Sequence, residues 1–559
     1  MAEPDRQEIG RRKVLARLGL VGATAAGTIV ASSGLSPALA QETDVKKPLT
    51  GDGVDVHSVL AFGAVGDGRA DDAKAIQLAI DAVAKLGGGV VHLPAHRTYV
   101  LGSPLHLKPG VTLRSERARA TIALTAAYAE TYVIDALAAN WSGLENLTLD
   151  CGERPKLTRA FHAQDSEHVE VRNVVASGIT AGVYVPDPGE GSSALLRFLN
   201  CRYVDVIDCE LFKCYIGINV AGNSSHVTID HCYVHDASEF GMHVLGGLTS
   251  HTEYLTISRC FLERIGGGPH PEFVGYPIYI TCGGNRPGAH KHRFVRGTDN
   301  TIIGNSKAFK VGGNADLFAI YDIFDGWFER NALFFGGDAG LSTDRCRKLV
   351  LANNIIGHCH TVGINVWQTN DTTVTGNICY NNVQNFDGTL SNEPRAGIRT
   401  YARPEFKAEN VVMVGNRCFD DQPKKTQLYG IYIHPRTQGA DIGANMLAGN
   451  AEGMYRAGSP ENVTYSHVHT VDALPTAGYW EKGMVVQLRT PGPGQPLQWL
   501  CTEGGKPGKW VPKSAFDVRA AITEPPAYVG QTAVAASVLY VATGTAAPAD
   551  WRKVADLPR

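Results

Sequence analysis

Short apolar segments recur through much of the chain at the spacing of a solenoid coil, and this repeat constrains the fold more than any other feature. Between residues 349 and 377, one apolar run leads to Asn354, a second follows at Gly363–Val366, and the pattern restarts before Asn377, 23 residues after Asn354. Each run is too short for a helix, alternates with a period of two and is β-branched, which indicates strands. Units of this size bury their apolar faces only by stacking on one another.

The same two-strand unit can be followed from residue 169 to residue 445. At the turn after the first strand, Asn tolerates a left-handed backbone and can hydrogen-bond to the next turn, while Cys behaves as a small buried side chain. The pattern predicts an all-β, right-handed parallel β-helix of about ten or more coils. The turn residues expected to stack are Asn173, Cys209, Cys232, Cys260, Asn305, Asn331, Asn354, Asn377, Asn416 and Asn445.

An amphipathic helix is expected before the first coil. Asp71 or Asp72 can cap it, its apolar positions Ala75, Ile76, Ala79, Ile80 and Val83 follow a 3.6-residue period, and three glycines at 87–89 end it.

This opening segment, residues 59–116, closely resembles the start of the pectate-lyase-like superfamily, which also includes rhamnogalacturonan-processing and phage tailspike-type β-helices. The resemblance implies a capping helix on a β-helix and a structural role for Asp67, Asp71 and Asp72. It implies the substrate only loosely, because the superfamily holds lyases, hydrolases, epimerases and noncatalytic adhesins. The matching residues are Phe62-Gly63-Ala64, Gly66-Asp67-Gly68, Asp71-Asp72, Ala75-Ile76-Gln77, Ala79-Ile80, Gly87-Gly88-Gly89 and Leu93-Pro94.

Residues 1–40 have the pattern of a twin-arginine export signal. Arg11-Arg12 precedes a weakly apolar stretch, and Ala38-Leu39-Ala40 fits a cleavage site before Gln41. The stretch is short and rich in Gly, Ala and Thr, which disfavours a stable membrane anchor. We therefore expect a periplasmic or secreted protein.

Four further segments are expected after the signal: a linker at 41–54, the β-helix at 55–460 with its cap and first coils at 55–125, a Trp-rich β module at 465–515 and a short β module at 520–559. Sugar binding, trimerisation and capping of the open solenoid end remain alternatives for the two C-terminal modules. A homotrimer is therefore one possible assembly.

Charge and cysteine content exclude several classes of function. The net charge is −3 with 19% charged residues, so no global field favours nucleic acid. The twelve cysteines form no CxxC pair and no zinc-ligand spacing. Those on the turn ladder are expected to be buried free thiols, because neighbouring coils lie about 4.8 Å apart, beyond the usual disulfide Cβ separation. No metal site is assigned and no cofactor is expected; Ca²⁺ would suit a lyase, but no Asp-rich run places it.

Function is expected on the outward side chains of the second strand, where equivalent positions stack in columns. This face gathers aromatic rings, which stack on sugars, and arginines, which bind carboxylates bidentately. The basic loop 266–298 would wall the groove and favour an acidic glycan. The first column reads Asn219, His243, Tyr279, Ala319, Ser342, Asn365, Arg399 and Tyr432, and the second reads Ala221, Leu245, Thr281, Tyr321, Asp344, Trp367, Tyr401 and His434.

Two chemistries fit these residues. In a lyase, Arg399 or Arg403 would neutralise a uronate carboxylate, and His243, Tyr401 or an arginine would take the α-proton. In a hydrolase, Asp322 and Asp344, which are 22 residues apart, would form an acid/base pair on neighbouring coils. The NTD, GHG and RIK motifs of polygalacturonase-type hydrolases and the RxPxxR segment of pectate lyases are missing.

The sequence therefore predicts an exported enzyme that cleaves an acidic, uronate-containing polysaccharide by β-elimination. Hydrolysis with Asp322 and Asp344 is the first alternative, and a noncatalytic glycan-binding or tailspike-like surface protein is the second. The residues expected to bind the substrate are Tyr279, Tyr321, Arg345, Asn365, Trp367, Arg403, His434 and Arg436.

Overall fold

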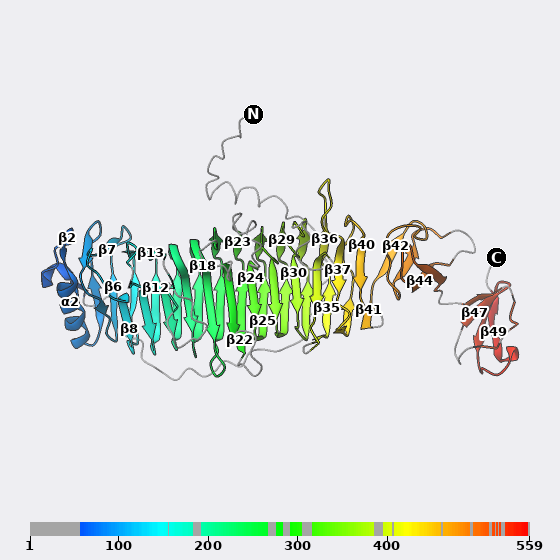
Figure 1. Ribbon diagram of the computed structural model, residues 1–559. Coiled ribbons are helices and arrows are strands. Elements are labelled where there is room, and N and C mark those ends of the chain that lie inside the picture. Colours follow the sequence, from blue (N-terminus) through cyan, green and yellow to red (C-terminus); the bar gives the residue numbers. More distant parts are fainter. Residues whose placement is uncertain are drawn as a thin grey trace, which may run out of the picture. The chain divides into compact units, whose positions relative to one another are not determined.

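The computed structural model describes residues 56–556 apart from 155, 181, 183–191, 267–274, 283–290, 305–315, 385–394, 405–406, 460–461, 492–495, 514–516, 520, 524 and 527–531. The predicted export signal and linker lie outside the described residues, as do Asn305 and about half of the loop predicted at 266–298. The described chain is almost entirely β-structure, and its first elements include helix α2 (Ala73–Lys85) (Figure 1).

Parallel strands stack coil upon coil, as the repeat predicts. Among the described residues, fifteen of these strands form one sheet, here called the first sheet. Each strand pairs in register with its equivalent one coil away, for example Val350 with Thr373. The strands are β1 (Val56–Ser58), β3 (Gly89–His92), β6 (Val111–Arg114), β9 (Gly143–Glu145), β12 (Glu167–Arg172), β15 (Arg202–Ile207), β17 (Ser225–Asp230), β19 (Glu253–Ser258), β22 (His292–Thr298), β25 (Ile323–Glu329), β28 (Arg347–Ala352), β31 (Thr372–Thr375), β35 (Val411–Val414), β39 (Ala440–Ile442) and β41 (Val463–Tyr465).

The second strands of the predicted repeat, which carry both outward-facing columns, form another stack, here called the groove sheet. It runs through β16 and β18, which are long enough to belong also to a third stack. The groove sheet comprises β5 (Leu105–His106), β8 (Tyr132–Leu137), β11 (Arg159–Gln164), β14 (Ala194–Leu199), β16 (Glu210–Ala221), β18 (Tyr233–Gly246), β21 (Tyr276–Cys282), β24 (Phe318–Tyr321), β27 (Leu341–Asp344), β30 (Ile364–Trp367), β33 (Ala396–Tyr401), β37 (Tyr429–Ile433) and β40 (Gly453–Ala457).

The third stack was not predicted, and it gives each full coil three strands instead of two. From β20 onward its strands are three residues long, too short to show an apolar period. Its members are β2 (Asp67–Asp71), β4 (Thr98–Leu101), β7 (Ala120–Leu124), β10 (Leu147–Asp150), β13 (Val175–Ile179), parts of β16 and β18, β20 (Phe261–Glu263), β23 (Thr301–Ile303), β26 (Ala332–Phe334), β29 (Ile355–Gly357), β32 (Ile378–Tyr380) and β36 (Arg417–Phe419). A two-stranded ribbon, β34 (Ala408–Glu409) with β38 (Thr437–Gln438), lies outside these stacks.

The turn between the first sheet and the third stack carries the predicted ladder. Asn354 Nδ2 donates to Phe328 O (3.1 Å) and to Asn377 Oδ1 (2.9 Å), and Asn354 Oδ1 accepts from the backbone N of Asn331 (3.0 Å). The same bonds link Asn377 to Asn416. Every polar atom of these buried amides is thus satisfied within the ladder, which fixes the register of the coils.

Two members of the predicted ladder are wrong. Asn300, not Asn305, occupies this position, because its Oδ1 accepts from Cys260 N (3.0 Å) and its N–H reaches Asn331 Oδ1 (3.1 Å). Asn173 lies one residue earlier, at a corner with φ 51°, so Val174 takes the ladder position there. The left-handed residue of each turn precedes the ladder residue, as Asn353 (φ 56°) precedes Asn354.

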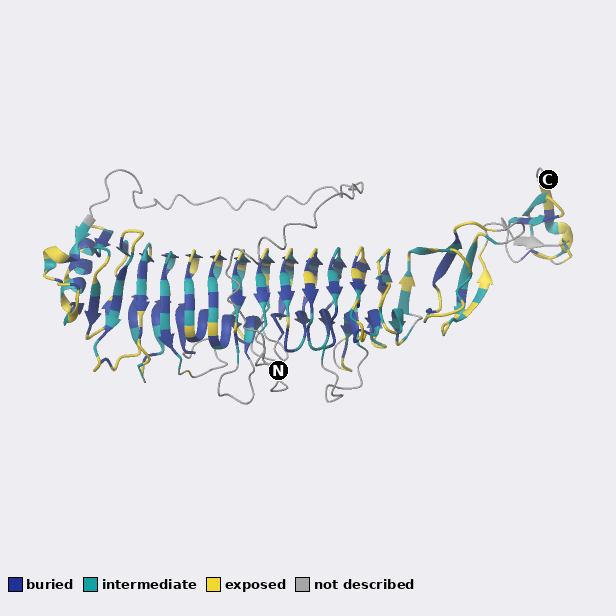
Figure 2. Ribbon diagram, turned by 90° about the horizontal axis from the view of Figure 1, so that it is seen from above, coloured by how far each residue is buried: buried dark blue, intermediate teal, exposed yellow. Residues whose placement is uncertain are grey.

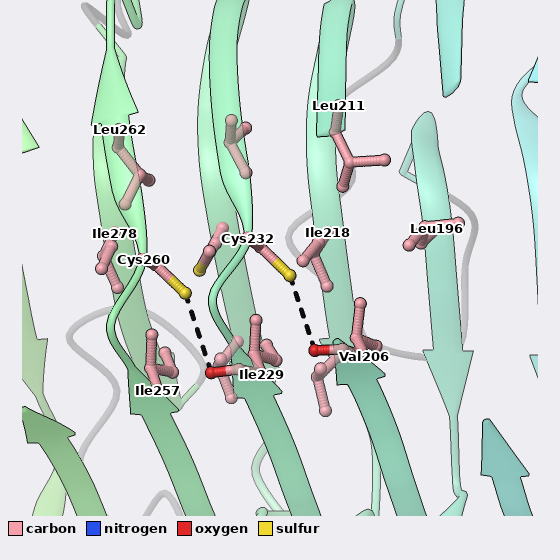
Figure 3. Close-up of a cluster of buried hydrophobic side chains, with 14 of the residues drawn as sticks. Leu196, Val206, Leu211, Ile218, Ile229, Cys232, Ile257, Cys260, Leu262 and Ile278 are labelled. Atoms are coloured by element: carbon pink, nitrogen blue, oxygen red, sulfur yellow. Dashed lines mark hydrogen bonds between the residues drawn. The ribbon is translucent and has the colours of Figure 1, made fainter. Parts of the chain in front are cut away.

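Cysteine replaces asparagine in the earlier coils, and Figure 3 shows how it does so. Cys232 Sγ donates to Val206 O (3.5 Å) and Cys260 Sγ donates to Ile229 O (3.7 Å), carbonyls of the preceding coil like those that the asparagine amides reach. All twelve cysteines lie among the described residues and are buried and unpaired, so the free-thiol prediction is confirmed. Burial raises the pKa of Cys209, which keeps that thiol protonated and unreactive.

Because a thiol is a weaker donor than an amide, the two kinds of ladder residue are expected to differ in their contribution to stability. Asn354→Ala leaves several buried groups without partners and should lower the free energy of unfolding by about 3 kcal/mol or more. Cys232→Ala should cost about 1–2 kcal/mol, mostly through lost packing. Urea denaturation measures both. The exposed Lys108→Ala is the control, and a loss for Asn354→Ala no larger than for this control would contradict the ladder's role.

Helix α2 buries Ile76, Ala79, Ile80 and Val83, as its period predicts, whereas Ala75 is only partly buried. The N-cap residue is Asp72, but its carboxylate accepts from Val65 N (2.6 Å) and Gly66 N (3.0 Å). Asp71 Oδ1 instead accepts from Ala73 N (3.1 Å), at the first turn of the helix. Both carboxylates therefore tie the cap to the chain around it. Beside the helix lies a 3₁₀ turn, η1 (Val59–Phe62).

One apolar core runs from the cap through the coils, and buried residues follow the strands along the stack (Figure 2). It continues into a four-stranded sheet of β42 (Val468–Val471), β43 (Val485–Leu488), β44 (Gln498–Glu503) and β45 (Lys509–Pro512), through Trp480, Met484 and Val486. Glu481 Oε1 accepts from Ala457 N (2.7 Å) at the last strand of the groove sheet. These contacts favour the end-capping alternative for this module.

A second four-stranded sheet has a small core of its own, around Ala533, Ala542 and Trp551. It comprises β46 (Asp517–Arg519), β47 (Thr532–Ala535), β48 (Val538–Ala542) and β49 (Trp551–Asp556), with a 3₁₀ turn, η4 (Pro548–Asp550). None of the helices in the described part of the chain has the length and apolar character needed to cross a membrane.

Candidate functional site

The predicted columns of the groove sheet are confirmed by strand register. His243 pairs with Asn219 and Tyr279, Ser342 pairs with Ala319 and Asn365, and Arg399 pairs with Asn365 and Tyr432. In the second column, Asp344 pairs with Tyr321 and Trp367, and Trp367 pairs with Tyr401. The first column also extends to residues that the sequence did not indicate, namely His106, Asp135, His162, Arg197 and Arg456.

The face is not open along its whole length. Arg197, Asn219 and His243 are at most 1% exposed. Towards the later coils, Trp367 and Tyr401 are half-buried and Arg403 is exposed. Tyr279 on β21 and Tyr321 on β24 are half-buried as well, so the accessible part of the predicted site is made of single side chains on several coils and of the turns after β33 and β37.

Asp322 is the centre of a buried ion-pair network. It occupies a corner with φ 59°, after β24, and its carboxylate is 1% exposed. Arg345 binds it bidentately, with Nε to Oδ1 and Nη2 to Oδ2 both at 2.9 Å, and Lys291 Nζ lies 2.5 Å from Oδ1. Thr281 Oγ1 and Cys282 N each donate to Oδ2 at 3.2 Å. Five donors thus converge on one carboxylate.

These donors decide the protonation state of Asp322. Burial alone would raise the pKa of Asp322, but the hydrogen bonds from Arg345 and the charges of Arg345 and Lys291 hold it below its ordinary value. A carboxylate that accepts five hydrogen bonds has no lone pair left for a water molecule. This geometry suits a structural anion better than a catalytic base.

Asp344 has the opposite character. Burial raises the pKa of Asp344 to about 6, and the attraction of Arg345 only partly opposes this rise. Its Oδ2 accepts a hydrogen bond from Arg345 Nη1, while Oδ1 finds no partner among the described residues. The pKa of Asp322 is thus lowered and that of the neighbouring Asp344 is raised, a pattern typical of acid/base sites.

Asp316 is a further buried acid, which the sequence analysis missed. It precedes β24, its Oδ1 accepts from Ala339 N (3.0 Å), and its Oδ2 accepts from the hydroxyl of Tyr321 (2.8 Å). Burial, together with the nearby charge of Asp338, raises the pKa of Asp316 to about 8. Asp316 and Asp338 are 22 residues apart, like Asp322 and Asp344, and this second pair of spaced carboxylates was the available signal.

His243 is packed among aromatic rings rather than exposed to a substrate. Its ring lies 4.6 Å from that of Phe240 and 5.5 Å from that of Tyr279, centroid to centroid. Burial, with the charges of Arg197 and His292, lowers the pKa of His243 to about 3. The imidazole is therefore neutral at physiological pH and is 0% exposed.

Arginines and aromatic rings meet on the last coils of the groove sheet. Arg399 Nε donates to Asn365 Oδ1 (3.0 Å), and the Arg399 guanidinium carbon lies 5.8 Å from the centre of the Tyr401 ring. The guanidinium of Arg403 lies 4.8 Å from the centre of the Trp367 ring. Both contacts lie within cation–π range.

The rings also contact one another. Those of Trp367 and Tyr401 meet at 5.3 Å and 87°, and His434 follows 4.8 Å from Tyr401. Burial, then the charges of Arg436 and Arg399, lowers the pKa of His434. Arg436 is exposed beside it.

No group of three or more His, Cys, Asp or Glu side chains in the described ranges is placed to hold a metal ion. Of the predicted basic loop, Arg286 and His290 lie outside the described residues. Lys291 belongs to the Asp322 network. His292 is buried, and its Nδ1 accepts from Thr252 N (2.9 Å), so it supports the fold.

Two families match successive parts of the chain. Residues 56–260 match the family described as rhamnogalacturonase A/epimerase, pectate lyase-like, and residues 289–479 match the family described as periplasmic copper-binding protein NosD. Among curated proteins, mannuronan C5-epimerase AlgE4 of Azotobacter vinelandii is 49% identical over 63 residues, and alginate lyase 7 of the same organism is 54% identical over 46 residues. These matches span 10% and 8% of this chain and only 11% and 5% of the two relatives.

Solved structures agree with the fold. Tailspike protein 3 of bacteriophage CBA120 superposes with a TM-score of 0.51 at 11% identity, over 82% of this chain and 70% of the tailspike. The Agl-KA catalytic domain superposes with a TM-score of 0.50 at 12% identity, over 75% of this chain and 69% of that domain. At these identities the similarity shows the fold alone.

Proposed function

We propose that this chain, a member of the pectate-lyase-like superfamily of parallel β-helix proteins, cleaves an acidic, uronate-containing polysaccharide by β-elimination on the later coils of the groove sheet. The observation that carries the proposal is the meeting of Arg399 and Arg403 with Trp367 and Tyr401, one to two coils beyond the protonatable Asp344. The short matches to a mannuronan C5-epimerase and an alginate lyase support an acidic polysaccharide.

Elimination at a uronate requires three tasks. A cation must neutralise the carboxylate so that the neighbouring carbon can lose its proton, a base must take that proton, and an acid must protonate the departing glycosidic oxygen. The electron pair of the broken C–H bond then forms the new C=C bond as the C–O bond breaks. We assign the first task to Arg403 with Arg399, because both lie beside the accessible rings.

Tyr401 is assigned as the base, because it is half-buried beside Arg399, whereas His243 is out of reach of a substrate. Asp344 is assigned as the acid that protonates the leaving oxygen. Its pKa of about 6 leaves the carboxyl protonated over part of the physiological range. Asp344 is 5% exposed, and its buried Oδ1 makes no hydrogen bond with the described residues. Asp344 and Tyr401 stand two coils apart, about 10 Å, which leaves room for a sugar ring between them.

Hydrolysis is the second candidate, and the raised pKa of Asp344 is the observation that favours it. The partner carboxylate would have to be other than Asp322, whose oxygens are saturated. Asp316 is a buried carboxylate with a raised pKa, and it accepts a hydrogen bond from the hydroxyl of Tyr321, the residue that pairs with Asp344. Export to the periplasm or beyond is part of the proposal, and the NosD-type match supports it.

The reaction is tested with the chain from Gln41 on a panel of uronate-containing and neutral polysaccharides. Absorbance near 235 nm, which reports the unsaturated uronate, and reducing ends are followed together. Elimination predicts that both rise on uronate polymers only. Reducing ends without absorbance would replace elimination by hydrolysis, and binding without either signal would leave a noncatalytic glycan-binding protein.

A further inference from the structure

A pocket of about 510 Å³ lies on the first sheet, away from the groove sheet. Its floor is formed by side chains at the same position of successive coils, because Glu253 pairs with Arg293, Arg293 with Phe324, and Phe324 with Arg347. The pocket's charged side chains are Glu253, Lys291, Arg293, Asp325, Arg347 and Lys348. A volume of this size holds a small saccharide.

The hollow arises where a column of stacked rings ends. Six rings at one corner of successive coils stack with centroids 3.6–4.8 Å apart: Trp141, His168, Tyr203, His226, Tyr254 and Phe294. In the next coil Asp325 takes the position of Phe294, and Lys348 follows it. Because these side chains are narrower than rings, the corner is no longer filled. The pocket is therefore a fixed product of the sequence at this corner.

Two cationic side chains of the pocket are available to an anionic ligand. Lys291 and Arg347 are held by Asp322 (2.5 Å) and Asp371 (2.6 Å), whereas Arg293 Nη2 and Lys348 Nζ make only loose pairs, 3.6 Å and 3.9 Å from the Asp325 carboxylate. The Arg293 and Lys348 side chains are 47% and 63% exposed, so their donors remain accessible to a ligand. Phe324, 37% exposed, adds an apolar surface beside them.

One residue joins this pocket to the groove sheet. Lys291 lines the pocket and also bonds to Asp322, whose other charged partner, Arg345, bonds to Asp344. A polymer held in the pocket would thus lie around the corner from the candidate acid, on the same coils. This position suits a part of the substrate remote from the bond that is cleaved.

We propose that this pocket binds a uronate unit of the polysaccharide, as a second saccharide subsite outside the groove. The inference rests on the proposed function for its ligand class. Guanidinium and ammonium groups bind the carboxylate, and Phe324 packs against the sugar ring. A free phosphate shares the anionic chemistry but would make no use of the apolar surface.

The test is a calorimetric titration of the full chain with a galacturonate trimer at low salt, in an Asp344→Asn background that slows cleavage. Arg293→Gln with Lys348→Gln should weaken one binding component at least tenfold and should leave a second component, in the groove, unchanged. Arg399→Gln with Arg403→Gln should do the reverse. Arg330→Gln, which breaks an exposed pair with Asp299, is the matched control and should change neither.

Two further ligands identify what the pocket binds. A neutral glucan trimer should not bind the pocket, and inorganic phosphate should bind it at least tenfold more weakly than the galacturonate trimer. Phosphate binding as tight as the trimer, or a titration insensitive to the Arg293 and Lys348 changes, would overturn the subsite. Cleavage of the trimer during the titration, seen at 235 nm, would count against the role of Asp344 but not against the pocket, because the two pairs of arginine and lysine variants separate the sites.

Discussion

Replacing Asp322 with alanine is expected to destabilise the protein by about 3–5 kcal/mol, because removal of one partner of a buried ion pair strands the other. Arg345 and Lys291, whose side chains are 11% and 23% exposed, would keep their charges without the carboxylate that holds them. Urea denaturation at pH 7 measures the loss. The pair of Asp299 with Arg330 has similar bidentate geometry but is 41% and 50% exposed, so Asp299→Ala should cost less than about 1 kcal/mol.

The pH dependence of this effect has a definite sign. Because the folded-state pKa of Asp322 lies below its unfolded value, its stabilising contribution is complete above the ordinary aspartate pKa and is lost as the pH falls through the folded-state value. The difference in stability between the wild type and Asp322→Ala should therefore shrink on acidification. Equal losses for Asp322→Ala and Asp299→Ala at pH 7 would show that the network adds nothing beyond a surface pair.

The largest expected effect on activity is that of Asp344→Asn, which should lower kcat by about 10²–10⁴-fold, the usual contribution of a general acid. The amide keeps the shape of the side chain but has no proton to give. Asp150→Asn, at an exposed carboxylate on β10, is the control and should leave kcat unchanged. Initial rates on the polysaccharide identified by the panel provide the measurement.

The wild-type rate should also depend on pH through this group. An acid must be protonated to act, so kcat should fall as the pH rises above about 6, the pKa to which burial raises Asp344. That limb should disappear in Asp344→Asn. A rate that continues to rise from pH 6 to pH 9 would exclude Asp344 as the acid.

The sequence predicted the strand register well because a period of two fixes which side chains share a face. The column of His243, Tyr279 and Arg399 follows from that rule alone. It could not predict the third stack, whose three-residue strands carry no period, and the neighbouring apolar segments led to the misplaced ladder position at Asn305. The sequence therefore predicted the register of the strands correctly but missed one of the three strands in each coil.

The chemistry of the candidate site was harder to predict than its position. Asp322 and Asp344 look alike in sequence, and their spacing correctly placed them on neighbouring coils. Their opposite properties arise because Arg345 turns at a left-handed corner and binds Asp322 with two nitrogens, which no linear pattern reveals. The sequence could not predict the exposure of these side chains either, because the burial of His243 depends on packing against Phe240 on its own strand and Tyr279 on the next.

The asparagine ladder bears on how such a protein could acquire a new specificity. The bond from Asn354 N to Asn377 Oδ1 is 2.9 Å long across 23 residues, and that from Cys260 N to Asn300 Oδ1 is 3.0 Å long across 40 residues. Asn377 and Asn416, 39 residues apart, make the same bond at 3.1 Å. The number of residues between two consecutive ladder residues therefore does not affect the hydrogen bond between them. Segments from a related solenoid, inserted between two consecutive ladder residues, could replace the loops that wall the groove and leave the stacked coils in place.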